Sequence, residues 1–160
     1  MKGREERREQ KSRKIVLIDL ENMMFGQHDS ERRTDRSTEI LELAQARRPG
    51  DMVIVGCNPQ LAFLAQEYFP TAKIVTGKGK DGADRALVEA IDIQHAADRY
   101  SELCIVSGDH AFCEVAHAAR QAGLRIRVVA PHAGLSVALR VYADTAVVIP
   151  EPFVTDELAA

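Results

Sequence analysis

The sequence predicts an α/β protein in which helices cover both faces of a mostly parallel sheet. Six short apolar segments, most of them rich in β-branched residues, alternate with segments of helical periodicity. A short continuous apolar run is typical of a strand buried on both faces, as in parallel sheets. Strands that alternate with helices indicate βαβ units, whose crossovers are nearly always right-handed. We therefore expect a three-layer sandwich.

The strands are expected at residues 15–18, 52–56, 73–76, 102–107, 125–130 and 146–149. The first of them ends abruptly on the carboxylate of Asp19. Helices are expected at 36–48, 58–69, 83–99, 111–122 and 135–142, with a loop at 23–35. Asn58 and Pro59 are suited to begin a helix, and Gly123 stands where a C-terminal cap is expected. The segment from about Ala83 to Arg99 is predicted to be the longest helix.

Length and composition favour one domain. The chain has 160 residues, of which 46% are hydrophobic, enough for one core. We expect a charged flexible arm at 1–13, a single domain at 14–150 and a tail at 151–160. Residues 1–14 carry about +4 and the remainder about −7. The arm could solubilise the chain or attract phosphates, and its interleaved glutamates favour the first role.

Cysteine use and the lack of targeting segments indicate a cytoplasmic protein. The three cysteines, Cys57, Cys104 and Cys113, lie in apolar surroundings and show no C-x-x-C spacing. This pattern argues against disulfides and a zinc site. The sequence contains no signal-peptide stretch and no run long enough to span a membrane.

Motifs of several common enzyme classes are absent. The segment Thr76–Lys80 has glycines and lysines, but neither the spacing nor the position of a phosphate-binding P-loop. No G-x-G-x-x-G dinucleotide fingerprint occurs. Glu21 stands where a phosphoaspartyl hydrolase needs a second Asp, and no G-x-S-x-G motif marks a serine hydrolase.

Acidic residues are the chemistry that remains. Asp19 ends the first strand, Asp109 follows the fourth, and Asp84 lies in the first turn of the helix at 83–99, on its core-facing stripe. Ligands of open α/β sheets bind beyond the carboxyl ends of the strands, where these side chains would meet. Carboxylates gathered there repel one another unless a hard cation such as Mg²⁺ or Mn²⁺ neutralises them.

Each carboxylate also has a structural interpretation. An Asp at a strand end can close a turn or cap the following helix. Asp84 could simply stabilise its helix from the first turn, by roughly 0.3–1 kcal/mol. Glu21, Asn22 and Ser107 are neighbouring polar groups that could orient metal ligands or waters.

Three motifs occur in order on the expected elements: Asp19–Asn22, the helix start at Asp84, and Ser107–Phe112, which reads S-G-D-H-A-F. Together they resemble the NYN domain family, a branch of the PIN-like nucleases. The resemblance runs from about Lys14 to Ile149, and the segment Gly134–Asp144 is similar to the last helix of the family.

This resemblance implies a PIN-like, Rossmann-like fold in which acidic residues at the strand ends hold Mg²⁺ or Mn²⁺ and RNA is cut. By motif, Asp19, Asn22, Asp84 and Asp109 match the active-site positions, and the three carboxylates among them match the metal ligands. Ser107 matches the residue beside them. The implied reaction is metal-assisted phosphodiester hydrolysis.

The sequence departs from the family pattern at two places. Many relatives read S-G-D-S-D-F, whereas Ala111 occupies the second acidic position here, which leaves open whether one metal or two would bind. Relatives often read K-G-x-D before the helix, and here Asp81 and Asp84 are both candidates. Helical phase favours Asp84, with Asp81 as an outer participant.

The expected partner is single-stranded RNA. Lys78, Lys80 and Arg85 flank the acidic edge and could contact its phosphates, although the two lysines could equally belong to a solvated loop. A homo-oligomer or a protein that delivers substrate is also compatible with the sequence. Two rival functions remain: a non-catalytic domain that binds RNA or protein with a degenerate metal site, and a small-molecule phosphatase.

Overall fold

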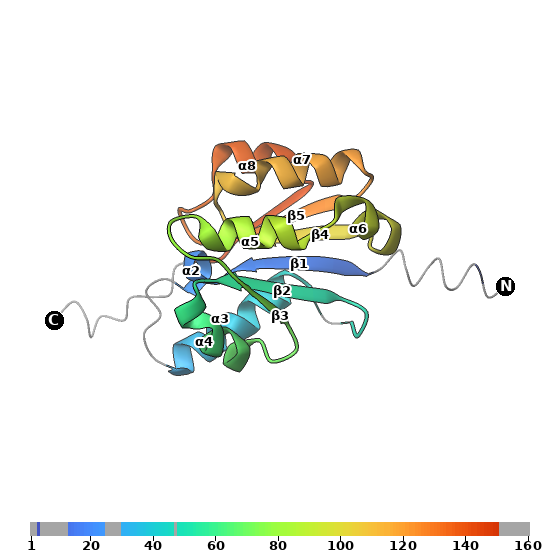
Figure 1. Cartoon of the computed structure of the whole chain (residues 1–160). Helices are drawn as coiled ribbons and strands as arrows, with labels where there is room; N and C mark the ends of the chain where they lie inside the picture. The colour runs from blue at the N-terminus through green and yellow to red at the C-terminus, as the bar shows by residue number, and fades with distance from the viewer. Residues whose placement is uncertain (1–2, 4–12, 25–29, 47, 151–160) are drawn as a thin grey trace.

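Six parallel strands form one sheet. The computed structural model describes residues 3, 13–24, 30–46 and 48–150, and its strands follow the order β3-β2-β1-β4-β5-β6 (Figure 1). Their bounds are β1 Lys14–Asp19, β2 Met52–Cys57, β3 Lys73–Thr76, β4 Glu102–Val106, β5 Arg125–Ala130 and β6 Thr145–Val148. All five pairings between neighbours are parallel, which confirms the predicted α/β fold. Most of the predicted arm and the whole predicted tail lie outside the described residues.

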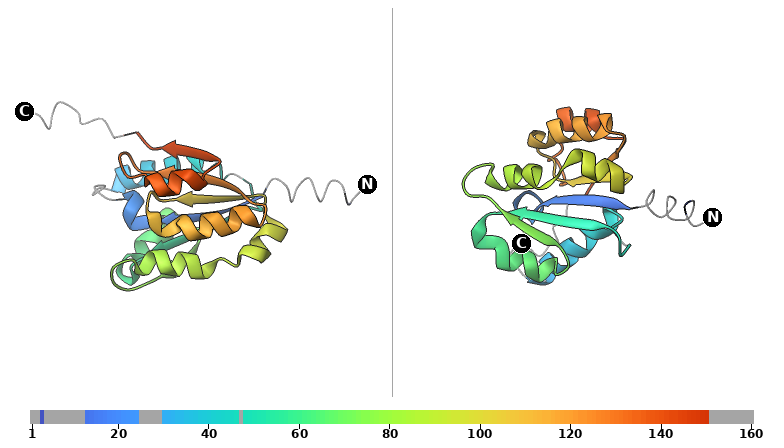
Figure 2. Two further views of the ribbon diagram at one scale, coloured as in Figure 1. Left: turned by 90° about the horizontal axis from the view of Figure 1, so that it is seen from above. Right: turned by 45° about the vertical axis from the view of Figure 1, so that its right-hand side comes forward.

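Helices cover both faces of the sheet. One face carries α5 Gly82–Ala90, α6 Ile93–Arg99, α7 Cys113–Gln121 and α8 Val137–Tyr142; the other carries α2 Leu20–Met24, α3 Ser30–Leu43 and α4 Ala62–Tyr68 (Figures 1 and 2). Two short 3-10 turns, η1 Pro59–Leu61 and η2 His110–Phe112, precede α4 and α7.

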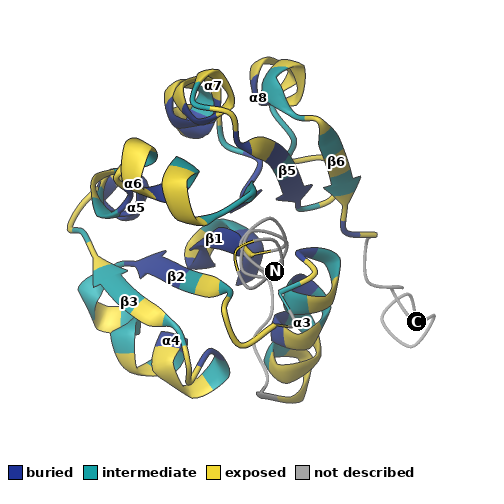
Figure 3. Ribbon diagram, turned by 90° about the vertical axis from the view of Figure 1, so that its right-hand side faces the viewer, coloured by how far each residue is buried: buried dark blue, intermediate teal, exposed yellow. Residues whose placement is uncertain are grey.

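The strand β1 shows why the sheet is buried on both sides. Successive side chains of a strand point to opposite faces, so Leu17 packs into the core under α5 to α8, whereas Val16 and Ile18 pack into the core with α3 and α4. All six residues of β1 are buried. In Figure 3 the buried residues concentrate on the strands and on the helix sides that face them. The apolar run at 15–18 therefore reflects two cores, one on each face.

The prediction of a single helix at 83–99 is wrong. The segment is divided into α5 and α6 because Ile91 is extended, with φ −101° and ψ 125°. Asp92 then caps α6, and its side chain accepts a hydrogen bond from the His95 N–H at 3.0 Å. Leu87, Ile91 and Ala96 all face the same core, so the apolar pattern continues across the break and hides it.

The predicted loop at 23–35 is also wrong in part. The short helix α2 begins directly after β1, and α3 begins at Ser30 rather than near residue 36. The first turns of α3 contain exposed polar residues such as Glu31, Thr34 and Asp35, so no apolar periodicity marks them. Helix α3 ends at Leu43, before the predicted end near residue 48, and Gln45 then adopts a left-handed conformation with φ 56°.

Other boundaries agree with the sequence to within a few residues. Asn58 caps η1, its side chain accepting a hydrogen bond from the Gln60 N–H at 3.1 Å, and Pro59 occupies the first helical position. Gly123 follows α7 with φ 99°, a conformation that favours glycine at a helix end. None of the helices in the described residues is long and apolar enough to cross a membrane.

Candidate metal centre

The strand order creates a crevice at the ends of β1 and β4. The chain leaves β1 toward the face that carries α3 and leaves β4 toward the face that carries α7. In open α/β sheets, neighbouring strands with connections on opposite faces leave an opening at their carboxyl ends, and ligands bind there. Asp19 is the last residue of β1, and Ser107 to Asp109 follow β4. The motif that begins at Asp19 and the motif that begins at Ser107 therefore meet at this opening.

Asp19 lies at the bottom of the site. It is 5% exposed, its Oδ1 accepts a hydrogen bond from the Asn22 N–H at 3.4 Å, and its Oδ2 accepts one from the Ser107 hydroxyl at 3.2 Å. Burial, followed by the charge and the hydrogen bond of Asp84, raises the pKa of Asp19 from 3.8 to about 7. The hydrogen bonds from Asn22 and Ser107 act in the opposite direction. Asp19 therefore holds a proton easily when no cation is near.

Asp84 reaches the site from the first turn of α5. This helix packs close to the strand ends because β2 has a glycine there: a Cβ on Gly56 would lie 2.4 Å from the Leu87 Cγ. Asp84 is 7% exposed. Burial raises its pKa, and the charges of Asp109 and Asp81 act in the same direction, although the hydrogen bond with Asp19 lowers it. The predicted inward orientation of Asp84 agrees with this burial.

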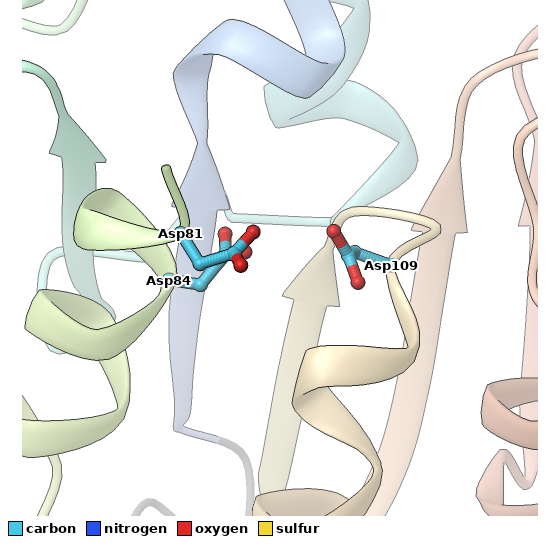
Figure 4. Close-up of side chains that lie close together, drawn as sticks. All are labelled: Asp81, Asp84 and Asp109. Carbon is cyan, nitrogen blue, oxygen red and sulfur yellow. The ribbon is translucent and has the colours of Figure 1, made fainter. Parts of the chain in front are cut away.

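Asp81 stands just before α5, in a left-handed conformation with φ 62°, and is exposed. One carboxylate oxygen from each of Asp81, Asp84 and Asp109 lies within 4.8 Å of the others. Figure 4 shows the side chains of Asp81 and Asp84 directed across the opening toward Asp109. The structure thus brings Asp84 together with Asp109 and Asp81, and places Asp19 against Asp84.

Asp109 caps the turn that leads into α7. Its Oδ1 accepts a hydrogen bond from the Ala111 N–H at 2.9 Å and lies 3.3 Å from the exposed His110 Nδ1. The Asp109 N–H donates to the Ser107 Oγ at 3.2 Å. The capping role proposed for an isolated carboxylate is therefore present at Asp109, and it coexists with the carboxylate cluster.

Asn22 and Ser107 join the ends of β1 and β4. The Asn22 Oδ1 accepts hydrogen bonds from the Gly108 N–H at 3.2 Å and from the Ser107 hydroxyl at 3.4 Å. Glu21 joins β1 to β2 instead, because its Oε1 accepts a hydrogen bond from the Asn58 N–H at 2.6 Å. These three polar side chains fix the strand ends that carry the carboxylates.

A pocket of about 320 Å³ opens over the cluster, between α5 and the start of α7. Its lining contains Asp81, Asp84, Asp109 and Arg85, then His110 and Ala111 of the S-G-D-H-A-F motif, and three residues that sequence reasoning missed: Val88, Glu89 and Glu114. Glu89 lies one helical turn after Arg85, so helical spacing could have indicated it. Lys78 and Lys80 are exposed in the loop before α5 and do not line this pocket.

The donor set suits a hard divalent cation. Within the described residues no Lys or Arg forms an ion pair with Asp19, Asp81, Asp84 or Asp109. Their oxygens are the ligands that Mg²⁺ and Mn²⁺ prefer, and a cation would favour the charged carboxylates, which burial and then mutual repulsion disfavour at Asp19 and Asp84.

Comparisons with known proteins identify the family. No curated protein matches the chain. Among solved structures, a Vibrio parahaemolyticus protein of unknown function, VPA0982, is similar at 15% identity with a TM-score of 0.61, covering 89% of this chain and 95% of that one, which shows the fold alone. A subunit of the tetrameric eIF2B-beta2-delta2 complex from C. thermophilum has 14% identity over 92% of this chain and 42% of that one, and its TM-score of 0.35 supports no argument. The family model of the NYN domain matches residues 13–150, and the chain therefore belongs to the NYN domain family.

Proposed function

We propose that this chain is a metal-dependent endoribonuclease that hydrolyses phosphodiester bonds of single-stranded RNA at the carboxyl edge of its sheet. NYN domains are generally nucleases of the PIN-like type, so hydrolysis is the activity that the family favours. The observation that supports it most is the convergence of the Asp81, Asp84 and Asp109 carboxylates within 4.8 Å. Within the described residues no Lys or Arg neutralises them.

The proposed cofactor is Mg²⁺ or Mn²⁺. Asp84 and Asp109 would hold it together with a third carboxylate, from Asp19 or Asp81. When bound, such a cation supplies an activated water and offsets charge on the leaving oxygen. Clustered acids without a cationic partner are costly to keep ionised, and this cost is what a divalent ion relieves.

The chain itself orients the site and receives the substrate. Ser107 and Asn22 fix Asp19 and the end of β4, so the carboxylates keep their positions. The pocket above them is large enough for a phosphate and is lined on one side by Arg85, whose guanidinium can pair with a phosphate oxygen. Lys78 and Lys80, exposed in the preceding loop, would contact neighbouring phosphates of the strand.

A cleavage assay tests the proposal. End-labelled single-stranded RNA is incubated with the full chain and Mn²⁺, with EDTA, and with the variant Asp109→Asn. Asn can still cap η2 through its side-chain oxygen, so Asp109→Asn should remove the charge and keep the local fold. The matched control is Asp98→Asn, which removes an exposed carboxylate from α6.

We expect internal cuts that need Mn²⁺, that Asp109→Asn lowers by at least about a hundredfold, and that Asp98→Asn leaves unchanged. RNA that remains intact under all conditions while still binding the chain would favour the non-catalytic alternative. The absence of an acidic side chain at the exposed Ala111, in the pocket lining, is the observation that favours that alternative. Hydrolysis of a phosphomonoester but not of RNA would indicate the phosphatase.

A further inference from the structure

An exposed aromatic side chain lies at the same edge of the sheet as the carboxylates. Phe63, the second residue of α4, is 92% exposed, whereas Ala65 and Phe69, on the inner side of this segment, are buried. Of the Phe and Tyr residues that the structure describes, Phe63 alone is exposed. A single exposed apolar residue is ordinary on a protein surface, so the position of Phe63 decides what it can do.

The end of β2 fixes that position. Asp19 and Gly56 are partners in the ladder between β1 and β2, so the two strands end at the same level. The Asn58 N–H then donates to the Glu21 Oε1 at 2.6 Å, which holds the turn before α4 against the end of β1. Figure 1 shows α4 at the end of the sheet toward which the arrows of β1 and β2 point. Phe63 therefore lies at the carboxyl edge, two strands from the end of β4.

The loop that carries Lys78 and Lys80 meets the same end of β2. The Gly77 N–H donates to the Cys57 carbonyl oxygen at 3.2 Å, so the loop 77–82 starts beside the turn that leads to α4. Gly77 and Gly82 lie so close that a Cβ on either would collide with the backbone of the other, which keeps the loop closed. Both lysines are exposed. A strand whose phosphates leave the pocket can follow them over the end of β2 toward α4.

The surroundings of Phe63 suit a nucleobase. Gln60 is exposed and stands three residues earlier, so the two side chains lie on the same side of the segment formed by η1 and α4. An aromatic ring can stack on any base, and an amide can hydrogen-bond to a base edge. Val137 and Val141, which are exposed on α8, have no flat face to offer. A basic track for the phosphates and an aromatic ring for a base are the usual parts of a single-strand binding surface.

We propose that Phe63 stacks on one unpaired base of the RNA strand held at the site, while Lys78 and Lys80 contact the phosphates between them and Gln60 contacts the edge of that base. The inference rests on the proposed function for the identity of the ligand. It also gives a reason for a single-stranded substrate. A base that is paired in a duplex is already stacked and its pairing edge is occupied, so Phe63 favours an unpaired strand.

Fluorescence anisotropy of an end-labelled single-stranded RNA of about ten nucleotides measures the affinity. The parent chain is the full chain with Asp109→Asn, which should keep the RNA intact. Phe63→Leu removes the ring and keeps an apolar side chain, whereas Phe63→Tyr keeps the ring. The matched control is Val141→Ala, which shortens an apolar side chain that is 70% exposed on α8. Circular dichroism checks that each variant is folded.

We expect Phe63→Leu to weaken RNA binding at least about fivefold, the lower end of the range for one stacked base. Phe63→Tyr and Val141→Ala should stay within about twofold of the parent chain. A series of RNAs with one abasic position each supplies a second readout. Removal of the stacked base should weaken binding to the parent chain but not to Phe63→Leu. A duplex of the same sequence should bind both chains equally.

Equal affinity of Phe63→Leu and the parent chain for single-stranded RNA would overturn the inference, as would an abasic series that affects both chains alike. A parent chain that sediments as a dimer, with Phe63→Leu monomeric and unchanged in RNA affinity, would assign Phe63 to a contact between copies instead. The inference and the proposed function fail in distinguishable ways. A chain that binds no RNA refutes both. Binding that depends on Phe63, in a wild type that leaves RNA intact with Mn²⁺, supports the stacking and refutes only the nuclease.

Discussion

Charged side chains lie at both ends of β1 and β4, but the pairing of these charges differs between the two ends. At the amino ends, Lys14 lies beside Glu102 on the neighbouring strand, with Nζ 3.6 Å from Oε1. Arg127 on β5 donates to the same Glu102 oxygen at 3.1 Å and to Gln45 Oε1 at 3.4 Å. All three charged side chains are at most 16% exposed. One carboxylate and two cations thus satisfy one another within the chain.

At the carboxyl ends four carboxylates lie near one another. Asp19 and Asp109 accept hydrogen bonds from hydroxyl and backbone groups, but no Lys or Arg of the described residues forms an ion pair with these two carboxylates or with Asp81 and Asp84. A buried charge left without a partner raises the free energy of the fold, so a chain keeps such a cluster only at a cost in stability. The comparison teaches that the amino-end network is explained by folding alone, whereas the carboxyl-end cluster has the composition of a site for a divalent cation.

Breaking the amino-end network should have the largest effect on stability. Glu102→Gln leaves Lys14 and Arg127 largely buried without their shared carboxylate, and we expect the free energy of unfolding to fall by about 3 kcal/mol. Urea denaturation at pH 7 measures this change. A loss below about 1 kcal/mol would show that the network is no more than a surface ion pair.

Adding metal should stabilise the carboxyl end. With Mn²⁺ at a hundredfold excess over its Kd, the free energy of unfolding should rise by about 2.7 kcal/mol. Asp109→Asn should abolish this gain and also melt higher than the wild type without metal, because it relieves repulsion. Thermal melts with Mn²⁺ and with EDTA check both points. A variant that melts lower in both conditions would mean that Asp109 acts chiefly as a cap.

Without metal, the free energy of unfolding should depend on pH through Asp19. Because the pKa of Asp19 is raised from 3.8 to about 7, the folded state holds a proton that the unfolded state has lost between these values. The contribution of Asp19 to the free energy of unfolding is therefore largest below pH 3.8, and it declines as the pH rises toward 7. The slope should approach about 1.4 kcal/mol per pH unit, the value for one proton.

The measurement is urea denaturation in EDTA from pH 4 to 8 for the wild type and Asp19→Asn. The difference between the two chains cancels the titration of carboxylates that do not interact with Asp19. Identical pH profiles would mean that Asp19 ionises normally in the fold.

The smallest effect should come from a pair whose carboxylate is partly exposed. The Arg36 Nη1 lies 3.6 Å from the Glu39 Oε2 on α3, where the Glu39 side chain is 40% exposed and the Arg36 side chain 12%. Glu39→Gln should change the free energy of unfolding by at most about 0.5 kcal/mol, because solvent screens this pair. The same urea titration used for Glu102→Gln measures it, and a loss as large as that of Glu102→Gln would remove the contrast between buried and exposed pairs.

Local patterns predicted the strands well because burial on both faces leaves an uninterrupted apolar run, as at Ile15–Ile18. They failed where two elements share one apolar stripe: Leu87, Ile91 and Ala96 face one core, so the break at Ile91 left no trace in the periodicity. They failed also where helix α3 begins on exposed polar residues, which have no apolar period to detect.

At the site, sequence reasoning named Asp81, Asp84 and Asp109, the three carboxylates of the cluster, and Asp19 beside them. Asp19 and Asp109 followed from their positions after strands, and Asp84 followed from its helical phase. Glu89 and Glu114 were missed because lining a pocket depends on the distance between α5 and α7, and no single segment encodes that distance. The arrangement of Asp81 was likewise inaccessible, since it depends on the contact between Gly77 and Gly82.

The sequence by itself determined the α/β class, most strand boundaries and the acidic character of the edge, because these depend on side-chain patterns along short segments. Only the tertiary structure decided the strand order, the paired charges of Lys14, Glu102 and Arg127, and which carboxylates face one another. The physical reason is that such distances follow from packing between remote residues. Because Gly56 has no side chain, Leu87 can pack against the end of β2. This contact places α5, and with it Asp84, close to the ends of the strands.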